Sequence, residues 1–126
     1  MYTVYYIVHT MSFGQYIKRS RELLAEANSG YSLRKVAAEI NVEPSFLSKV
    51  ERDLVAPPSE QKIKALAVCL KEDPDVLLAM AGKVSTDLQD IIRKRPQLFG
   101  DLIRKLKSEP DHAVLKLVRE VKTGEW

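Results

Sequence analysis

Residues 32–53 contain the feature that most constrains the fold: two short amphipathic helices separated by a very tight turn. The first predicted helix follows Ser32, a favourable N-cap residue, and its apolar positions share one face: Leu33, Val36, Ala37 and Ile40. Asn41 and Val42 form the turn, and asparagine tolerates the left-handed backbone region better than most residues. Pro44 then suits the first position of a second helix that extends to about residue 53. This pattern predicts a helix-turn-helix unit.

Similar helical spacing continues on both sides of this unit. A helix is expected over residues 13–27, with apolar positions at Phe13, Ile17, Leu23, Leu24 and Ala27. Two more are expected after Ser59 and after Asp73, the second ending at Gly82. Residues 12–82 show no alternation typical of strands. We therefore predict an all-α chain in which five helices form the domain at residues 12–82.

The remaining residues fall outside this domain. Residues 83–126 are expected to form C-terminal helices, with a break before Pro96 and a last helix that follows Ser108 and ends at Gly124. Residues 1–11 form an N-terminal extension, because MYTVYYIVHT is rich in Tyr and β-branched residues, unlike the rest of the chain. Two interpretations of this extension stay open, an ordered arm or edge strand and a translated leader.

Composition excludes several classes of function. The single Cys69 cannot form a disulfide within the chain, which favours a cytoplasmic protein, associated with the bacterial nucleoid when it is bound to DNA. His9, Cys69 and His112 lack the spacing of metal ligands, so neither a metal nor another cofactor is expected. No stretch predicts a membrane span, and no catalytic constellation is present, so we do not expect an enzyme. The net charge of +3 permits nucleic-acid binding without requiring it.

The helix-turn-helix segment also carries a family resemblance. The stretch YSLRKVAAEINVEPSFLSKVERD, residues 31–53, followed by Pro57-Pro58-Ser59, resembles the phage repressor/Cro (Xre) family of helix-turn-helix transcriptional regulators. The resemblance covers about residues 12–80 and implies a lambda-repressor-like five-helix DNA-binding domain. Three positions depart from the family pattern. Leu33 replaces a phosphate-contacting Gln, while Asn41 and Asp53 replace Gly at positions that favour left-handed angles.

The resemblance implies specific roles for individual residues. The helix that begins at Pro44 would enter the major groove, and base contacts are expected from Pro44, Ser45, Phe46 and Lys49. Packing against the preceding helix is the alternative for Phe46. DNA phosphates would lie next to Ser32, Arg34, Lys35, Glu43, Ser48 and Arg52, although the basic residues among them are equally consistent with solvated surface charges. Arg21 and Glu51 occupy the family positions of a largely buried structural ion pair.

Members of this family usually bind DNA as symmetric dimers. The expected homodimer contact is the apolar stripe in the C-terminal helices, which comprises Leu98, Phe99, Leu102, Ile103 and Leu106. Packing of the same stripe within one chain is the alternative. The predicted function is therefore a sequence-specific transcriptional regulator, a repressor that binds double-stranded DNA at a palindromic operator. Two other functions stay open: an antitoxin whose C-terminal helices bind a partner protein, and an adaptor that no longer contacts DNA bases.

Overall fold

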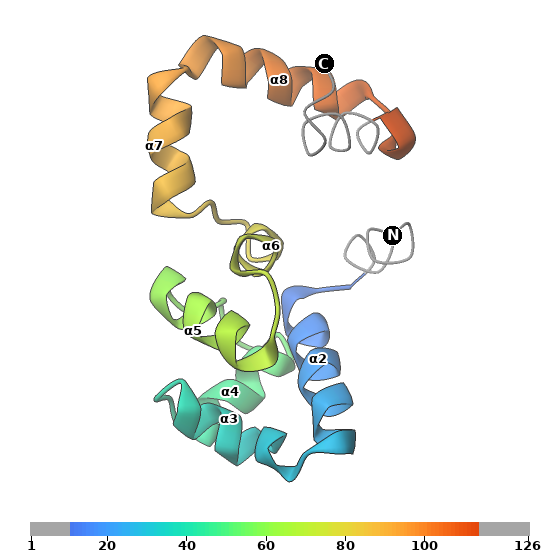
Figure 1. Cartoon of the computed structure of the whole chain (residues 1–126), viewed down its shortest axis with the longest axis vertical. Coiled ribbons are helices and arrows are strands. Elements are labelled where there is room, and N and C mark those ends of the chain that lie inside the picture. The colour runs from blue at the N-terminus through green and yellow to red at the C-terminus, as the bar shows by residue number, and fades with distance from the viewer. Residues whose placement is uncertain (1–10, 114–126) are drawn as a thin grey trace. The chain divides into compact units, whose positions relative to one another are not determined.

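The computed structural model describes residues 11–113, and every regular element in this range is a helix, as the all-α prediction requires (Figure 1). The chain divides into two compact units, residues 1–85 and 86–126, a boundary three residues beyond the predicted one. The first unit contains α2 (Phe13–Ala27), a 3-10 turn η1 (Ser29–Tyr31), α3 (Leu33–Glu39), α4 (Pro44–Glu51), α5 (Glu60–Leu70) and α6 (Pro74–Met80). The second contains α7 (Thr86–Lys94) and α8 (Pro96–Ser108).

Side-chain caps start most helices of the first unit. The Ser32 hydroxyl accepts a hydrogen bond from the Lys35 backbone N–H, and the Ser59 hydroxyl accepts one from the Lys62 backbone N–H. Both caps were predicted. Pro44 occupies the first turn of α4, as expected from its missing N–H. These local signals fix where the helices begin.

Four helices of the first unit end with the same backbone motif. In each case the first or second residue after the helix adopts a left-handed conformation; these residues are Asn41, Asp53, Lys71 and Gly82. After α4, for example, the Asp53 N–H donates to the Val50 carbonyl and the Leu54 N–H donates to the Lys49 carbonyl, which is the Schellman pattern. The left-handed geometry predicted for Asn41 and Asp53 is thus confirmed. Because Asp53 turns the chain, α4 ends at Glu51, two residues earlier than expected.

One hydrophobic core connects the helices of the first unit. Its fully buried side chains include Ile17, Val36, Leu47, Ile63, Leu66, Leu70, Leu77 and Leu78. The prediction for α2 is partly wrong, because Leu23 is 54% exposed and Ala27 is also exposed. Phe13, Ile17 and Leu24 define the inner face instead, and buried Ser20 occupies the position between Ile17 and Leu24. Its hydroxyl donates to Glu72 at 3.0 Å, which explains a polar group there.

In the second unit, the break between α7 and α8 lies where predicted, at Arg95 before Pro96. The two helices contact each other, and each also exposes large apolar side chains. The predicted last helix lies mostly outside the described residues, which include only its first turn at residues 111–113. The N-terminal extension also lies outside them, except for Met11. None of the described helices is long and apolar enough to cross a membrane.

Candidate nucleic-acid interface

The α3–turn–α4 segment forms a closely packed helix pair. Ala37 is fully buried where the small side chain lets the helices approach, and Leu47 and Val50 of α4 are 2% exposed. The Asn41 backbone has φ 59°, and the Val42 N–H donates to the Ala37 carbonyl at 2.9 Å. The chain therefore changes direction within four residues, 40–43, and the two helices form the predicted helix-turn-helix.

A lysine from α5 holds this turn. The Lys62 ammonium donates to the Ile40 carbonyl at 2.8 Å and to the Asn41 carbonyl at 3.1 Å. A cation at the C-terminal end of α3 also interacts favourably with the helix dipole. This role was not predicted, because no pattern in a single sequence shows that Lys62 will contact residues that lie 21 and 22 positions before it.

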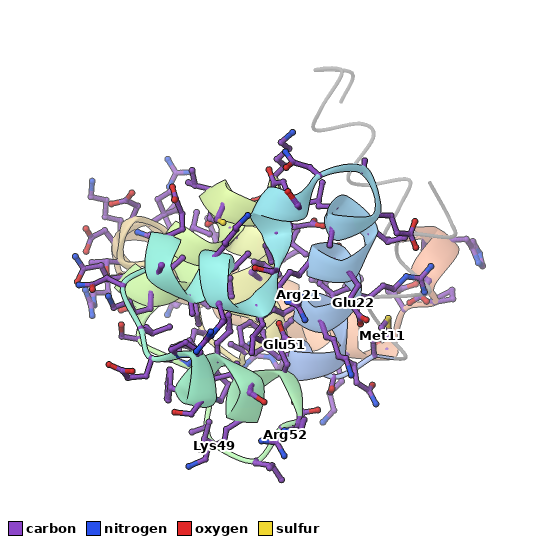
Figure 2. All side chains as sticks on the ribbon, turned by 90° about the horizontal axis from the view of Figure 1, so that it is seen from below. Met11, Arg21, Glu22, Lys49, Glu51 and Arg52 are labelled. Atoms are coloured by element: carbon purple, nitrogen blue, oxygen red, sulfur yellow. The ribbon has the colours of Figure 1, made fainter. Side chains whose placement is uncertain are left out.

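The side chains of α4 separate onto two faces. Leu47, Val50 and Glu51 are buried on the inner face. Ser45, Lys49 and Arg52 are exposed, and we call these three residues the outer face of α4. Figure 2 shows Lys49 and Arg52 directed away from the domain, whereas Arg21 and Glu51 lie within it. The Arg52 Nε donates to the Ser48 carbonyl at 3.3 Å, so its guanidinium stays beside the helix end. The outer face thus presents hydroxyl and cationic donors.

The other residues predicted to contact DNA differ in exposure. Pro44, Phe46 and Ser48 are half-buried, and Phe46 packs against the core, so only part of its ring is open to a thymine methyl. Glu43 is exposed at the start of α4, and its side chain makes no capping hydrogen bond. An ionised carboxylate only accepts hydrogen bonds, so the Glu43 side chain is poorly suited to a phosphate.

The beginning of α3 carries the remaining phosphate candidates. Arg34 and Lys35 are exposed, and Ser32 is exposed although its hydroxyl already accepts the Lys35 N–H. Leu33 is half-buried and packs against the core, so this departure from the family pattern contributes to packing. The structure therefore leaves two cationic side chains here that can meet an anion.

Arg21 and Glu51 form a nearly buried ion pair. Arg21 Nε lies 2.7 Å from Glu51 Oε2, Arg21 Nη2 lies 3.0 Å from Glu51 Oε1, and the side chains are 11% and 4% exposed. Arg21 Nη1 also donates to the Tyr31 carbonyl at 3.2 Å. The hydrogen bonds to Glu51 raise the pKa of Arg21 further above its usual value. The pair thus connects α2 with both α4 and η1.

A second carboxylate contact between α4 and α2 was not predicted. Asp53 accepts hydrogen bonds from the Ser12 hydroxyl at 2.6 Å and from the Gly14 backbone N–H at 3.0 Å. The sequence pattern predicted for Asp53 only a left-handed backbone. The residue that indicates the contact is Gly14, because a Cβ there would lie 2.3 Å from the Val50 carbonyl oxygen. Such crowding requires glycine where α2 approaches α4.

Glu72 provides another unpredicted contact. One of its carboxylate oxygens accepts a hydrogen bond from the Tyr16 hydroxyl and the other accepts one from Ser20, both at 3.0 Å. Burial and the adjacent Glu72 carboxylate raise the pKa of Tyr16 above its usual value. These bonds join α2 to the loop that follows α5.

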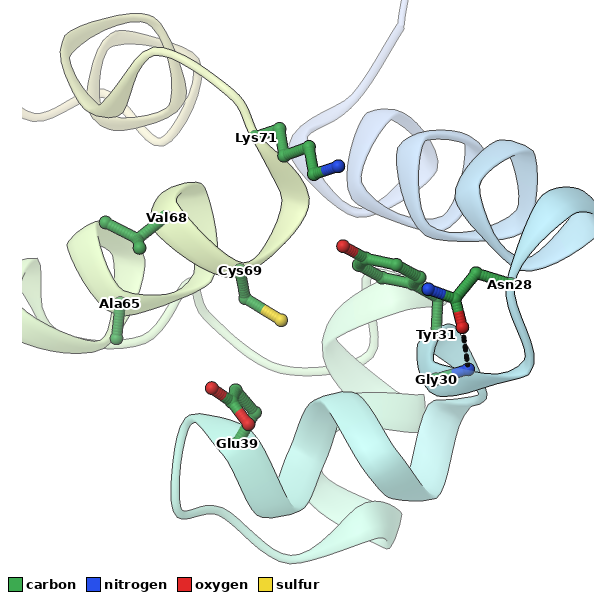
Figure 3. A pocket seen from close by; sticks show the side chains of 8 residues that line it. All are labelled: Asn28, Gly30, Tyr31, Glu39, Ala65, Val68, Cys69 and Lys71. Carbon is green, nitrogen blue, oxygen red and sulfur yellow. Dashed lines mark hydrogen bonds between the residues drawn. The ribbon is translucent and has the colours of Figure 1, made fainter.

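A cleft of about 610 Å³ lies beside the helix-turn-helix, between η1, α3 and α5 (Figure 3). It is lined by Asn28, Gly30, Tyr31, Glu39, Ala65, Val68, Cys69 and Lys71. Burial, with a smaller effect from Glu39, raises the pKa of the Cys69 thiol, which makes a reactive thiolate unfavourable. The cleft shows no arrangement typical of catalysis.

In the second unit, the predicted dimer residues lie along α8. Leu98, Leu102 and Ile103 are 69%, 41% and 50% exposed, while Phe99 and Leu106 are half-buried. The polar face of the same helix carries an ion pair between Asp101 and Arg104.

Comparison with protein-family models agrees with this geometry. The model of the family described as helix-turn-helix matches residues 20–77. A chain in a solved structure named "SinR protein/SinI protein complex" is 27% identical to this chain, over 77% of this chain and 99% of that one, with a TM-score of 0.44. No curated protein matches.

The matched residues run from the middle of α2 into α6 and include the whole helix-turn-helix. The match agrees with the resemblance to phage repressor/Cro regulators. It supports a DNA-binding transcriptional regulator of the helix-turn-helix class.

Proposed function

We propose that the protein is a repressor that binds a palindromic operator as a homodimer, with one α4 helix in the major groove of each half-site. The observation that carries this proposal is the division of α4 into a buried inner face and an exposed outer face of Ser45, Lys49 and Arg52. An α-helix fits the major groove, where the four base pairs present different donors and acceptors. Lys49 is the donor proposed to contact guanine.

Phosphate contacts are assigned to Arg34 and Lys35 on α3 and to Arg52 at the end of α4. These side chains are exposed and cationic, and they lie on the two helices that would meet the groove and its border. They would orient the protein without selecting a sequence. Ser32, Ser48 and the partly covered Phe46 are assigned supporting contacts. Glu43 is expected to lie near the phosphates. No hydrogen bond to them is assigned to its side chain, because an ionised carboxylate cannot donate one.

Selection of binding sites from random duplexes tests the proposal directly. The selected sequences should form an inverted repeat with half-sites about one helical turn apart. Lys49→Ala should weaken binding to the selected site about fivefold to 150-fold and relax the preference at one base position. Lys107→Ala is the matched control, because it removes an exposed cation from α8. Selected sequences without a common motif, or equal effects of the two variants, would contradict base contact through α4.

The proposed phosphate contacts are tested by the dependence of DNA affinity on salt concentration. Affinity should fall steeply as salt concentration rises, and Arg34→Ala should lower the slope of log K against log salt by about 0.9 while weakening binding to all duplexes similarly. Salt-insensitive binding would favour the adaptor alternative. Repression itself is tested with a reporter downstream of the selected site, where deletion of the protein should raise expression.

The homodimer is assigned to the apolar side chains of α8. Leu102→Glu places a charge among them and should convert a dimer into a monomer in sedimentation experiments, with a large loss of operator affinity. Gln97→Glu adds the same charge on the polar face of α8 and should leave the dimer intact. The exposed apolar face also suits a heterologous partner, the antitoxin alternative. Stoichiometric co-purification of a second protein, lost in Leu102→Glu, would support that alternative over the homodimer.

A further inference from the structure

Two acidic residues at the C-terminal end of α4 contact α2 or its N-cap residue, although acidic residues at this end of a helix are electrostatically unfavourable. Glu51 is the last residue of α4, and Asp53 follows two residues later. Glu51 pairs with Arg21, which explains the first acid. Among residues 11–113, Asp53 has no cationic partner of this kind; it instead lies at the N-terminus of α2, where the helix dipole favours a negative charge.

The contacts of Asp53 form a small network with the cap of α2. Asp53 Oδ1 accepts the Gly14 N–H, and Asp53 Oδ2 accepts the proton of the Ser12 hydroxyl. The Ser12 oxygen in turn accepts the Gln15 N–H at 3.1 Å, and the Ser12 N–H donates to Gln15 Oε1 at 3.1 Å. We call Ser12, Gly14 and Asp53 the Asp53 network. Its hydrogen bonds join residues about 40 positions apart in the sequence.

The residue types at positions 14 and 53 are explained by the same contact. Asp53 has φ 58°, a conformation that glycine adopts without cost and that an aspartate adopts with some strain. Glycine instead occupies position 14, where a Cβ would lie 2.5 Å from Asp53 Oδ1 and 2.3 Å from the Val50 carbonyl oxygen. The close approach at Gly14 and the carboxylate at Asp53 therefore serve the same contact between α2 and α4.

We propose that Asp53 is a positioning residue for DNA binding, because it fixes the end of α4 against the start of α2 and thereby fixes the direction of the outer face. The inference rests on the proposed function of that face. The Arg21–Glu51 pair holds α4 to the middle of α2, while the Asp53 network holds it to the first turn of α2. Core packing through Leu47 and Val50 holds the inner face of α4, and two polar attachment points along α2 further restrict its tilt. Asp53 itself touches no base in this proposal.

The test compares Asp53→Gly and Asp53→Asn in the full chain. Asp53→Gly removes the carboxylate and relieves the left-handed strain, so the thermal midpoint should change by less than about 5 °C. Its affinity for the selected operator should nevertheless fall about tenfold, with the salt slope unchanged because no phosphate contact is lost. Asp53→Asn keeps an acceptor oxygen and the tolerated backbone, so its affinity should fall by only about threefold. Asn41→Gly is the matched control, since it changes the equivalent residue after α3 and should bind as the wild type does.

The opposite outcomes overturn the proposal. Equal affinities of Asp53→Gly and Asn41→Gly would show that the network does not position α4. Tighter binding by both Asp53 variants would show that the carboxylate only repels DNA. A measurement on the free protein separates this inference from the proposed function: residual dipolar couplings should show a changed α4 direction relative to α2 in Asp53→Gly but not in Asn41→Gly. If the wild type binds no duplex, the proposed function fails, and unchanged couplings would independently overturn the role of Asp53.

Discussion

Removal of the Glu51 carboxylate should be among the most destabilising single changes in the first unit. In Glu51→Ala, the Arg21 guanidinium loses two hydrogen bonds, of 2.7 and 3.0 Å, and keeps its 3.2 Å bond to the Tyr31 carbonyl. Loss of one partner from a buried ion pair costs about 3–5 kcal/mol, because the other charge stays desolvated. The Arg21 side chain is 11% exposed and can recover some hydration, so we expect about 3 kcal/mol.

This loss is large enough to measure by two methods. A loss of about 3 kcal/mol should lower the thermal midpoint of a domain of this size by about 12 °C or more. Urea denaturation should show a reduced midpoint with an unchanged slope, because the surface exposed on unfolding is the same. Lys49→Ala, which changes an exposed residue two positions earlier, should stay within about 0.5 kcal/mol of the wild type.

Two further variants test whether a stranded charge is the cause. Glu51→Gln keeps one acceptor for Arg21 and should lose less stability than Glu51→Ala. A double variant, Arg21→Met with Glu51→Met, removes both charges and should be more stable than Glu51→Ala alone, because apolar pairs often replace buried ion pairs without loss. Equal, small effects of Glu51→Ala and Lys49→Ala would refute the argument. A double variant that is less stable than Glu51→Ala would also refute it.

Three more predictions concern stability. Gly14→Ala should destabilise the first unit by about 1–3 kcal/mol in urea denaturation, because the new Cβ would overlap the Val50 carbonyl oxygen. Lys71→Gly should stabilise it by up to about 1 kcal/mol, because glycine adopts the observed φ of 59° without strain; a loss of stability would contradict this. The pKa of Tyr16 is higher in the folded state than in the unfolded chain, so its phenol contributes stability below pH 10. This contribution should disappear as the pH rises further, because Tyr16 ionises first in the unfolded chain. Tyr16→Phe should show a smaller alkaline loss of stability in urea titrations at several pH values.

The sequence predicted those parts of the fold that depend on neighbouring residues. Caps at Ser32 and Ser59, the start of α4 at Pro44 and the turn at Asn41 follow from backbone preferences within a few positions. The left-handed Lys71 was missed, because lysine carries no preference for that conformation. Local chemistry therefore indicated where helices begin more reliably than where they end.

Contacts between distant residues could not be predicted in this way. The bonds of Glu72 to Tyr16 and Ser20 span 56 and 52 positions, and the Lys62 contact with Ile40 spans 22. Each depends on how the helices pack, which the period of apolar residues does not specify. The Arg21–Glu51 pair was predicted only because the family resemblance supplied the three-dimensional arrangement.

The arrangement of α4 separates the requirements of folding from those of DNA contact. Leu47, Val50 and Glu51 are buried and hold the helix, whereas Ser45 and Lys49 are exposed and make no side-chain contact on which the core depends. Substitutions at Ser45 and Lys49 should therefore change the preferred operator while the free energy of unfolding stays nearly constant. Substitutions on the inner face should do the reverse, since they lower the fraction of folded protein and weaken binding to every duplex alike. A helix with this separation can acquire a new sequence preference without a new fold.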